Sequence, residues 1–85
     1  MKTLQYTITD ELGIHARPAG LLGKLAKSYQ SNILVASGGK EAKAKNVMAL
    51  MGLGAVKGAE ITVTVDGPDE DEAAAAVEEF LKANL

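Results

Sequence analysis

Apolar side chains at every second position are the feature that most constrains the fold of this 85-residue chain. The pattern covers residues 2–8 and returns over residues 60–66, each time with polar side chains at the alternate positions. Its apolar members are Leu4, Tyr6, Ile8, Ile61, Val63 and Val65. A period of two is typical of a strand with one face buried and the other in water. The pattern therefore predicts two half-buried strands, one near each end of the chain.

A glycine pair separates two shorter segments with strand character. Residues 33–37 form a short apolar run, and residues 40–45 place Ala42 and Ala44 on one face and charged side chains on the other. Gly38-Gly39 between them is typical of a tight hairpin turn. The second segment is polar on its open side, as expected for an antiparallel sheet with one face in water.

Helical spacing of apolar side chains predicts three helices. The first runs from Ala16 to about Tyr29 and is closed by Ser31 and Asn32, and the second is short with Asn46 as its N-cap. The third begins with the acidic run 69–72, where the helix dipole favours negative charge. The predicted inward stripes are Leu22, Leu25, Ala26 and Tyr29 in the first helix, Val47, Leu50 and Met51 in the second, and Ala73, Ala76, Val77, Phe80 and Leu81 in the third.

The predicted order of elements is β-α-β-β-α-β-α. Three helices with apolar stripes need a sheet face to cover, so the order predicts a two-layer α+β domain. Neither an internal repeat nor a domain boundary is visible. We therefore expect residues 1–85 to form a single domain with one modest core.

Composition argues against several functional classes. The chain has no cysteine and one histidine, so we expect neither disulfides nor a metal site. Its formal net charge of −2 and its three aromatic side chains do not favour nucleic-acid binding. No segment reads as a signal peptide or as a membrane span, so we expect a cytoplasmic protein without membrane insertion.

The run Gly13-Ile14-His15-Ala16-Arg17-Pro18 carries the strongest functional groups. It holds the only histidine and the only arginine of the chain, at the predicted start of the first helix. Free backbone N–H groups and the helix dipole favour an anion there and disfavour an imidazolium, so we expect a neutral ring. A neutral imidazole is a nucleophile, and an arginine side chain can donate two parallel hydrogen bonds to phosphate oxygens. This run indicates phosphoryl chemistry at His15.

A simpler interpretation is that a lone histidine before a helix is only a polar loop residue. The sequence places no second acid or base close to His15, and no Ser/His/Asp set is available without help from the fold. Leu21, off the apolar stripe, is either an isolated surface leucine or part of a docking patch. Met48 either fills a gap in the core or belongs to an adaptable binding surface.

The stretch Gly13-Ile14-His15-Ala16-Arg17-Pro18-Ala19 closely resembles the active-site signature of HPr. HPr is the histidine-containing phosphocarrier of the bacterial phosphoenolpyruvate–sugar phosphotransferase system. The resemblance covers the whole chain and includes a second matching stretch, residues 45–53. It implies a two-layer open-faced sandwich, with a four-stranded antiparallel sheet covered on one face by three helices.

The resemblance also implies the roles of individual residues. His15 would accept a phosphoryl group on Nδ1 from phosphorylated enzyme I and donate it to an enzyme IIA domain in sugar uptake. The Arg17 side chain and the backbone N–H groups of Ala16 and Arg17 would hold the phosphoryl group. The protein would then be a carrier rather than a turnover enzyme, and we expect it to act as a monomer without a cofactor.

Partner docking is implied at an apolar centre ringed by lysines, which suits acidic partner surfaces. The matching positions are Gly20, Leu21, Lys24, Lys27, Val47, Met48, Met51 and Gly52.

Asn46 departs from the pattern of many HPr proteins of low-GC Gram-positive bacteria. They carry a serine there, which a dedicated kinase phosphorylates to control carbon catabolite repression. Asparagine keeps the helix cap but has no hydroxyl, so this chain has no regulatory serine at that position. Two alternatives stay open: an HPr-fold regulatory docking module, and a phosphocarrier of a nitrogen-related branch.

Overall fold

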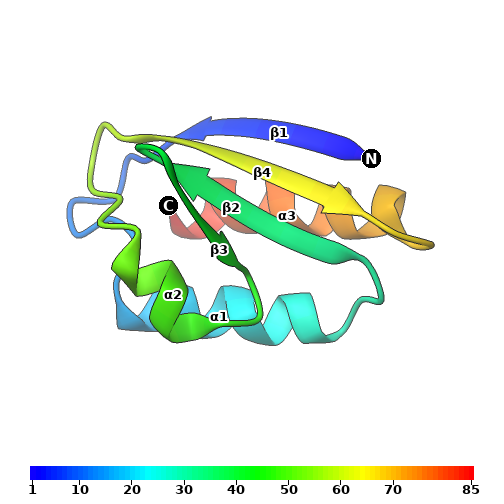
Figure 1. The fold of residues 1–85 in the computed structure, drawn as a ribbon. Helices are drawn as coiled ribbons and strands as arrows, with labels where there is room; N and C mark the ends of the chain where they lie inside the picture. Colours follow the sequence, from blue (N-terminus) through cyan, green and yellow to red (C-terminus); the bar gives the residue numbers. More distant parts are fainter.

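Four strands and three helices follow one another in the predicted order. The computed structural model describes all 85 residues. The elements are β1 (Lys2–Thr7), α1 (Ala16–Lys27), β2 (Asn32–Ser37), β3 (Lys40–Lys43), α2 (Val47–Gly52), β4 (Glu60–Asp66) and α3 (Glu70–Asn84). Figure 1 shows the sheet as one layer, with α1 and α3 behind and below it.

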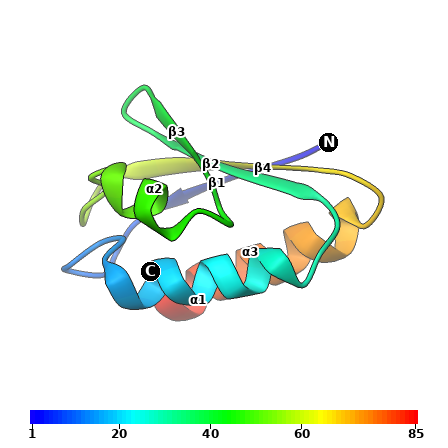
Figure 2. The same cartoon turned by 60° about the horizontal axis from the view of Figure 1, so that its bottom comes forward.

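The strands form one sheet in the order β1-β4-β2-β3, and every neighbouring pair is antiparallel. Val63 in β4 pairs with Leu4 of β1 on one side and with Val35 of β2 on the other. In Figure 2, α1 and α3 lie side by side on the same side of the sheet. The helix α2 packs against α1 and β3. The predicted open-faced α+β sandwich is therefore confirmed.

The core lies between the sheet and the helices. Ile61, Val63 and Val65 are fully buried, whereas Thr62 and Thr64 between them are only half-buried on the open face of the sheet. The helices contribute the fully buried side chains Leu22, Ala26, Leu50, Ala73, Val77 and Leu81. Each large aliphatic side chain buried in this way stabilises the fold by about 1.5–3 kcal/mol. The two alternating segments of the sequence thus become β1 and the centre of the sheet.

The helix α1 ends at Lys27, two residues before the predicted end. Ser28 donates from its backbone N–H and from its hydroxyl to the Leu25 carbonyl oxygen, and Tyr29 N–H donates to Ala26. These bonds to the residue three positions back tighten the last turn and stop the helix. Ser31, predicted to close the helix, is instead a fully buried loop residue.

The third strand and the second helix also differ from the prediction in detail. The strand β3 ends at Lys43 rather than at residue 45, because a turn with an Asn46 N–H to Lys43 carbonyl bond follows. Within α2, Leu50 is fully buried as predicted and Val47 is half-buried. Met51, predicted to point inward, is 42% exposed because this six-residue helix buries a single side chain, Leu50.

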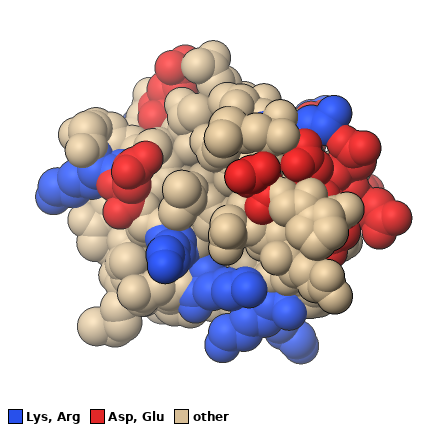
Figure 3. All heavy atoms as spheres, turned by 45° about the vertical axis from the view of Figure 1, so that its right-hand side comes forward, with Lys and Arg blue, Asp and Glu red and all other residues tan.

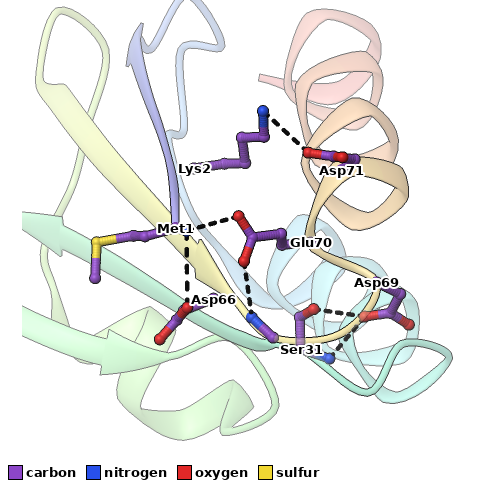
Figure 4. Close-up of polar contacts among 8 residues, drawn as sticks. Met1, Lys2, Ser31, Asp66, Asp69, Glu70 and Asp71 are labelled. Atoms are coloured by element: carbon purple, nitrogen blue, oxygen red, sulfur yellow. Dashed lines mark hydrogen bonds and ion pairs between the residues drawn. The ribbon is translucent and has the colours of Figure 1, made fainter.

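A network of polar contacts joins the start of α3 to the loop after α1 (Figure 4). The Asp69 carboxylate accepts hydrogen bonds from the backbone N–H groups of Gln30 and Ser31, both at 2.9 Å, and from the Ser31 hydroxyl. The hydrogen bond from the Ser31 hydroxyl is the main reason why the pKa of Asp69 is below its ordinary value of 3.8, and the backbone hydrogen bonds lower it further. Asp69 is the N-cap of α3, but its side chain fixes the neighbouring loop instead of the helix.

Ion pairs at the same end connect β1 to α3. The Met1 amino group lies 2.6 Å from Glu70 Oε2, and Lys2 Nζ lies 3.0 Å from Asp71 Oδ1. The hydrogen bond from Met1 is the main reason why the pKa of Glu70 is lowered. Figure 3 shows acidic side chains crowded on one flank of the molecule and a group of basic side chains below them. In Figure 1, the start of α3 lies at the opposite end from the loop between β1 and α1.

Candidate functional site

The loop between β1 and α1 is held by contacts to residues 55 and 56 and by a hydrogen bond within the loop. Gly13 has a φ of +66°, and its backbone is packed against Ala55 and Val56. Ile14 N–H donates to the Ala55 carbonyl oxygen at 2.9 Å, and Gly13 N–H donates to the Asp10 carbonyl oxygen at 3.1 Å. These contacts hold the chain in a defined turn just before the helix begins, so the position of His15 is set by the backbone.

His15 is the N-cap residue of α1, in agreement with the helix start predicted at Ala16, and its backbone is extended. Its carbonyl oxygen accepts the first helical hydrogen bond, from Ala19 N–H at 3.0 Å, while its side chain makes no capping bond. Ala16 and Arg17 are the first two helical residues, so their N–H groups have no carbonyl partner within the helix. Pro18 follows them and has no N–H to satisfy. Two backbone donors therefore remain free beside the imidazole.

The Arg17 side chain lies on the same side of the molecule as His15. Both residues line one shallow pocket, whose wall also includes Leu21 from α1 and Asn84 from α3. The guanidinium of Arg17 takes part in no ion pair and no side-chain hydrogen bond. A free guanidinium and two free backbone N–H groups next to an imidazole form a site for an anion such as a phosphoryl group.

Asp10 is a member of this site that the sequence analysis missed. Its Oδ2 atom lies 3.6 Å from His15 Nε2, although no acid was expected near the histidine. The two side chains are 38% and 37% exposed, so both are in contact with water. They are five positions apart along the chain, and the turn around Gly13 brings them together. Asp10 stands in the turn after the alternating segment 2–8, and no periodic pattern in the sequence places it beside His15.

The residues predicted for partner docking lie on the two adjacent helices α1 and α2. Gly20, Leu21, Lys24 and Lys27 are exposed on α1, and Met48, Met51 and Gly52 are exposed on α2. Met48 is 80% exposed and therefore does not fill a gap in the core. Leu21 is 42% exposed and lines the His15 pocket, and its part in docking stays a prediction. Val47 differs from these exposed residues: it is half-buried, because its side chain packs against α1 at Gly23.

Two further apolar residues near His15 were not singled out from the sequence. Leu12 is 69% exposed and lines the same pocket as His15. Val56 is 57% exposed, and its backbone lies against Gly13. Leu12 and Leu21 thus add exposed apolar surface beside the imidazole. Leu12 and Val56 are loop residues without periodic spacing, which is why the pattern analysis gave no signal for them.

Comparison with known proteins identifies the family. Residues 2–83 match the family described as "PTS HPr component phosphorylation site". The chain belongs to the HPr family. The family's members are phosphocarriers of the phosphotransferase system, and the match spans every strand and nearly all of α3.

Solved structures of HPr proteins agree with this assignment. HPr from Thermoanaerobacter tengcongensis is 34% identical, with a TM-score of 0.91 over 98% of this chain and 93% of that one. The histidine-containing phosphocarrier protein from Mycoplasma is 37% identical, with a TM-score of 0.90 over 93% of this chain and 90% of that one. Crh of Bacillus subtilis, described as a catabolite repression protein and a swapped dimer, is 29% identical, with a TM-score of 0.78 over 100% and 98%.

The oligomeric state of this chain stays a prediction. We expect a monomer, while Crh and another HPr structure from Thermoanaerobacter tengcongensis are described as dimers. None of the three helices is both long enough and apolar enough to cross a membrane.

Proposed function

We propose that His15 carries a phosphoryl group on Nδ1, taken from phosphorylated enzyme I and given to an enzyme IIA domain in sugar uptake. The observation that supports it is the half-exposed imidazole at the start of α1, beside two free backbone N–H groups and the unpaired Arg17. A nucleophile, an anion hole and a counter-charge come from three consecutive residues, which leaves the ring open to a docked partner.

Each side chain has a distinct part in the transfer. The Nδ1 lone pair forms the N–P bond while the bond from phosphorus to the donor breaks and the donor keeps its electron pair. Arg17 and the N–H groups of Ala16 and Arg17 bind the negative oxygens as they approach. No further cation lines the pocket. We therefore expect a moderate hold on the phosphoryl group, suited to a carrier that must release it.

Partner docking is proposed at the exposed residues of α1 and α2. Met48 and Met51 offer flexible apolar contacts, and methionine adapts to more than one partner surface. Lys24 and Lys27 on α1 form the basic part of this surface and favour acidic partners. One surface would then serve both the donor and the acceptor, which bind in turn.

The test is a reconstituted relay of phosphoenolpyruvate, enzyme I, this protein and an enzyme IIA domain. Phosphate should reach the IIA domain with wild-type protein and should not with His15→Ala. Arg17→Ala should slow the transfer about 10- to 100-fold, because it removes hydrogen bonds between a charged donor and the phosphoryl oxygens in the transition state. A panel of IIA domains, including those of the nitrogen-related branch, identifies the branch that is served. Phosphate transfer that persists in His15→Ala would refute the proposal.

A regulatory docking module is the second candidate, because the fold is also that of Crh. A module that acts only by docking needs neither the His15 imidazole nor a free Arg17 beside it. Stable binding of a partner without phosphate uptake would support this second candidate.

Asn46 leads to a related proposal about regulation. Because asparagine has no hydroxyl, the kinase that phosphorylates the matching serine in other HPr proteins has no acceptor at this position. Incubation with that kinase and ATP should leave the mass of the protein unchanged, with a serine-bearing HPr as the positive control. A gain of one phosphate would contradict the proposal.

A further inference from the structure

Asp10 is held in place by three hydrogen bonds. Its backbone N–H donates to a main-chain oxygen of Leu85 at 2.9 Å, and its carbonyl oxygen accepts from Gly13 N–H at 3.1 Å. Its Oδ2 atom accepts from the Leu12 backbone N–H at 3.0 Å. Backbone and side chain are thus fixed before any partner binds. The carboxylate has a defined position on the rim of the His15 pocket.

The fixed carboxylate faces one particular nitrogen of the histidine. Oδ2 lies 3.6 Å from Nε2, and Nδ1 is on the other side of the ring. A carboxylate attracts the imidazole proton to the nitrogen that it faces, and this leaves the lone pair on the other nitrogen. In a neutral imidazole, only the nitrogen without a proton can act as the nucleophile.

We propose that Asp10 is a positioning residue that keeps the proton on Nε2 of His15 and so leaves Nδ1 free to accept the phosphoryl group. The inference rests on the proposed function, and it names a residue that the signature around His15 does not contain. Asp10 touches neither the phosphoryl group nor the donor, so it acts entirely through the imidazole.

The charge balance of the transfer step explains what Asp10 adds. When Nδ1 forms its bond to phosphorus, the donor leaves with its electron pair and Nε2 keeps its proton. The ring then carries one positive charge, which lies beside the Asp10 carboxylate. No proton has to leave the ring during uptake, and none has to return during release. Asp10 therefore stabilises the phosphorylated ring as well as the reactive tautomer.

The charges of the pocket also favour a phosphoryl group on Nδ1 over one on Nε2. Arg17 is the only cation among the lining residues, and Asp10 is the only carboxylate. A phosphoryl group on Nε2 would stand directly against the Asp10 carboxylate, and its negative oxygens would be repelled. A phosphoryl group on Nδ1 is on the far side of the ring from Asp10 and avoids this repulsion. The Asp10 carboxylate therefore also disfavours phosphorylation of Nε2.

The test compares Asp10→Asn with Glu11→Gln. Asparagine keeps an oxygen that can accept from the Leu12 N–H but lacks the charge, and Glu11 is an exposed neighbour without an ion pair. Ring ¹⁵N NMR at alkaline pH, where imidazole is neutral, reads the tautomer of His15 directly. Phosphoryl uptake is measured without enzyme I by using phosphoramidate as the donor. This small molecule has a P–N bond that breaks during the transfer and releases ammonia.

The wild-type protein and Glu11→Gln should hold the proton on Nε2. The Nδ1–H tautomer should increase about three- to fivefold in Asp10→Asn, with a similar fall in the rate of uptake, as for a half-exposed charge pair. A mixed tautomer in wild-type protein, or an unchanged ratio in Asp10→Asn, would overturn the inference. Failure of enzyme I to phosphorylate His15 would instead refute the proposed function, and the tautomer would still be measured.

Discussion

Gly13 and Ala55 are so close that a β-carbon on Gly13 would lie 2.1 Å from the Ala55 carbonyl oxygen. Gly13 also has a φ of +66°, in the left-handed region that other residues rarely adopt. The contact joins the loop before α1 to the loop after α2, and Ile14 adds a hydrogen bond to the same carbonyl. This contact therefore helps to fix the start of α1 relative to α2.

Gly13→Ala should destabilise the protein and displace His15. Left-handed backbone and overpacking against Ala55 together should lower the free energy of unfolding by about 2–4 kcal/mol. Gly20→Ala is the matched control, because a β-carbon there meets nothing within 4 Å. That variant should stabilise α1 by about 0.5–1 kcal/mol. Urea unfolding measures both, and equal effects of the two substitutions would contradict the packing described here.

Gly23 has a comparable role where α1 meets α2. A β-carbon at Gly23 would lie 2.9 Å from Cγ2 of Val47, so Gly23→Ala forces the two helices apart or Val47 to move. We expect Gly23→Ala to be less favourable than Gly20→Ala by about 1–3 kcal/mol. In a Val47→Ala background most of that difference should disappear. A double-mutant cycle measures the coupling, and additive effects would mean that the helices do not meet at this pair.

Asn46 should matter for stability through its side-chain oxygen. Oδ1 accepts from the Ala49 backbone N–H at 3.2 Å and caps α2. Asn46→Ala should lower the free energy of unfolding by about 1 kcal/mol, whereas Asn46→Ser should be close to wild type, since serine is an equally good cap. Denaturation midpoints of the three proteins test the ranking. A serine variant as unstable as the alanine variant would contradict a capping role.

The lowered pKa of Asp69 predicts how stability depends on pH. A carboxyl group whose pKa is lower in the folded state stabilises the fold above its ordinary value of 3.8, and this contribution is lost as pH falls through the folded value. The unfolding free energy should therefore fall in acid in the wild-type protein, and fall less in Asp69→Asn. Glu72→Gln, an exposed acid of the same turn without a hydrogen bond, is the control. Identical acid profiles for wild type and Asp69→Asn would contradict the prediction.

Much of the fold follows from short-range sequence patterns, and those parts were predicted correctly. Alternation placed β1 and β4, the glycine pair placed the hairpin at 38–39, and a polar residue before an apolar stripe placed the cap of α2. The position of His15 at the N-cap of α1 followed from the same local reasoning. Each of these features depends on side chains within a few positions of one another.

The features that the sequence did not show depend on contacts between distant segments. Ser31 is buried because Asp69, 38 residues later, accepts its hydroxyl hydrogen bond. Met51 is exposed because α2 is too short to bury a second turn. Asp10 reaches His15 only because Gly13 is held against Ala55. No periodicity encodes such contacts, so the carboxylate beside the histidine became visible only in the structure.

Intact mass spectrometry tests most directly the claim that His15 carries a transient phosphoryl group. After incubation with phosphoenolpyruvate and enzyme I, the wild-type protein should gain the mass of one phosphoryl group and lose it again in mild acid, as a phosphohistidine does. His15→Ala should gain nothing under the same conditions. An unmodified wild-type protein, or an acid-stable phosphate that persists in His15→Ala, would contradict the claim.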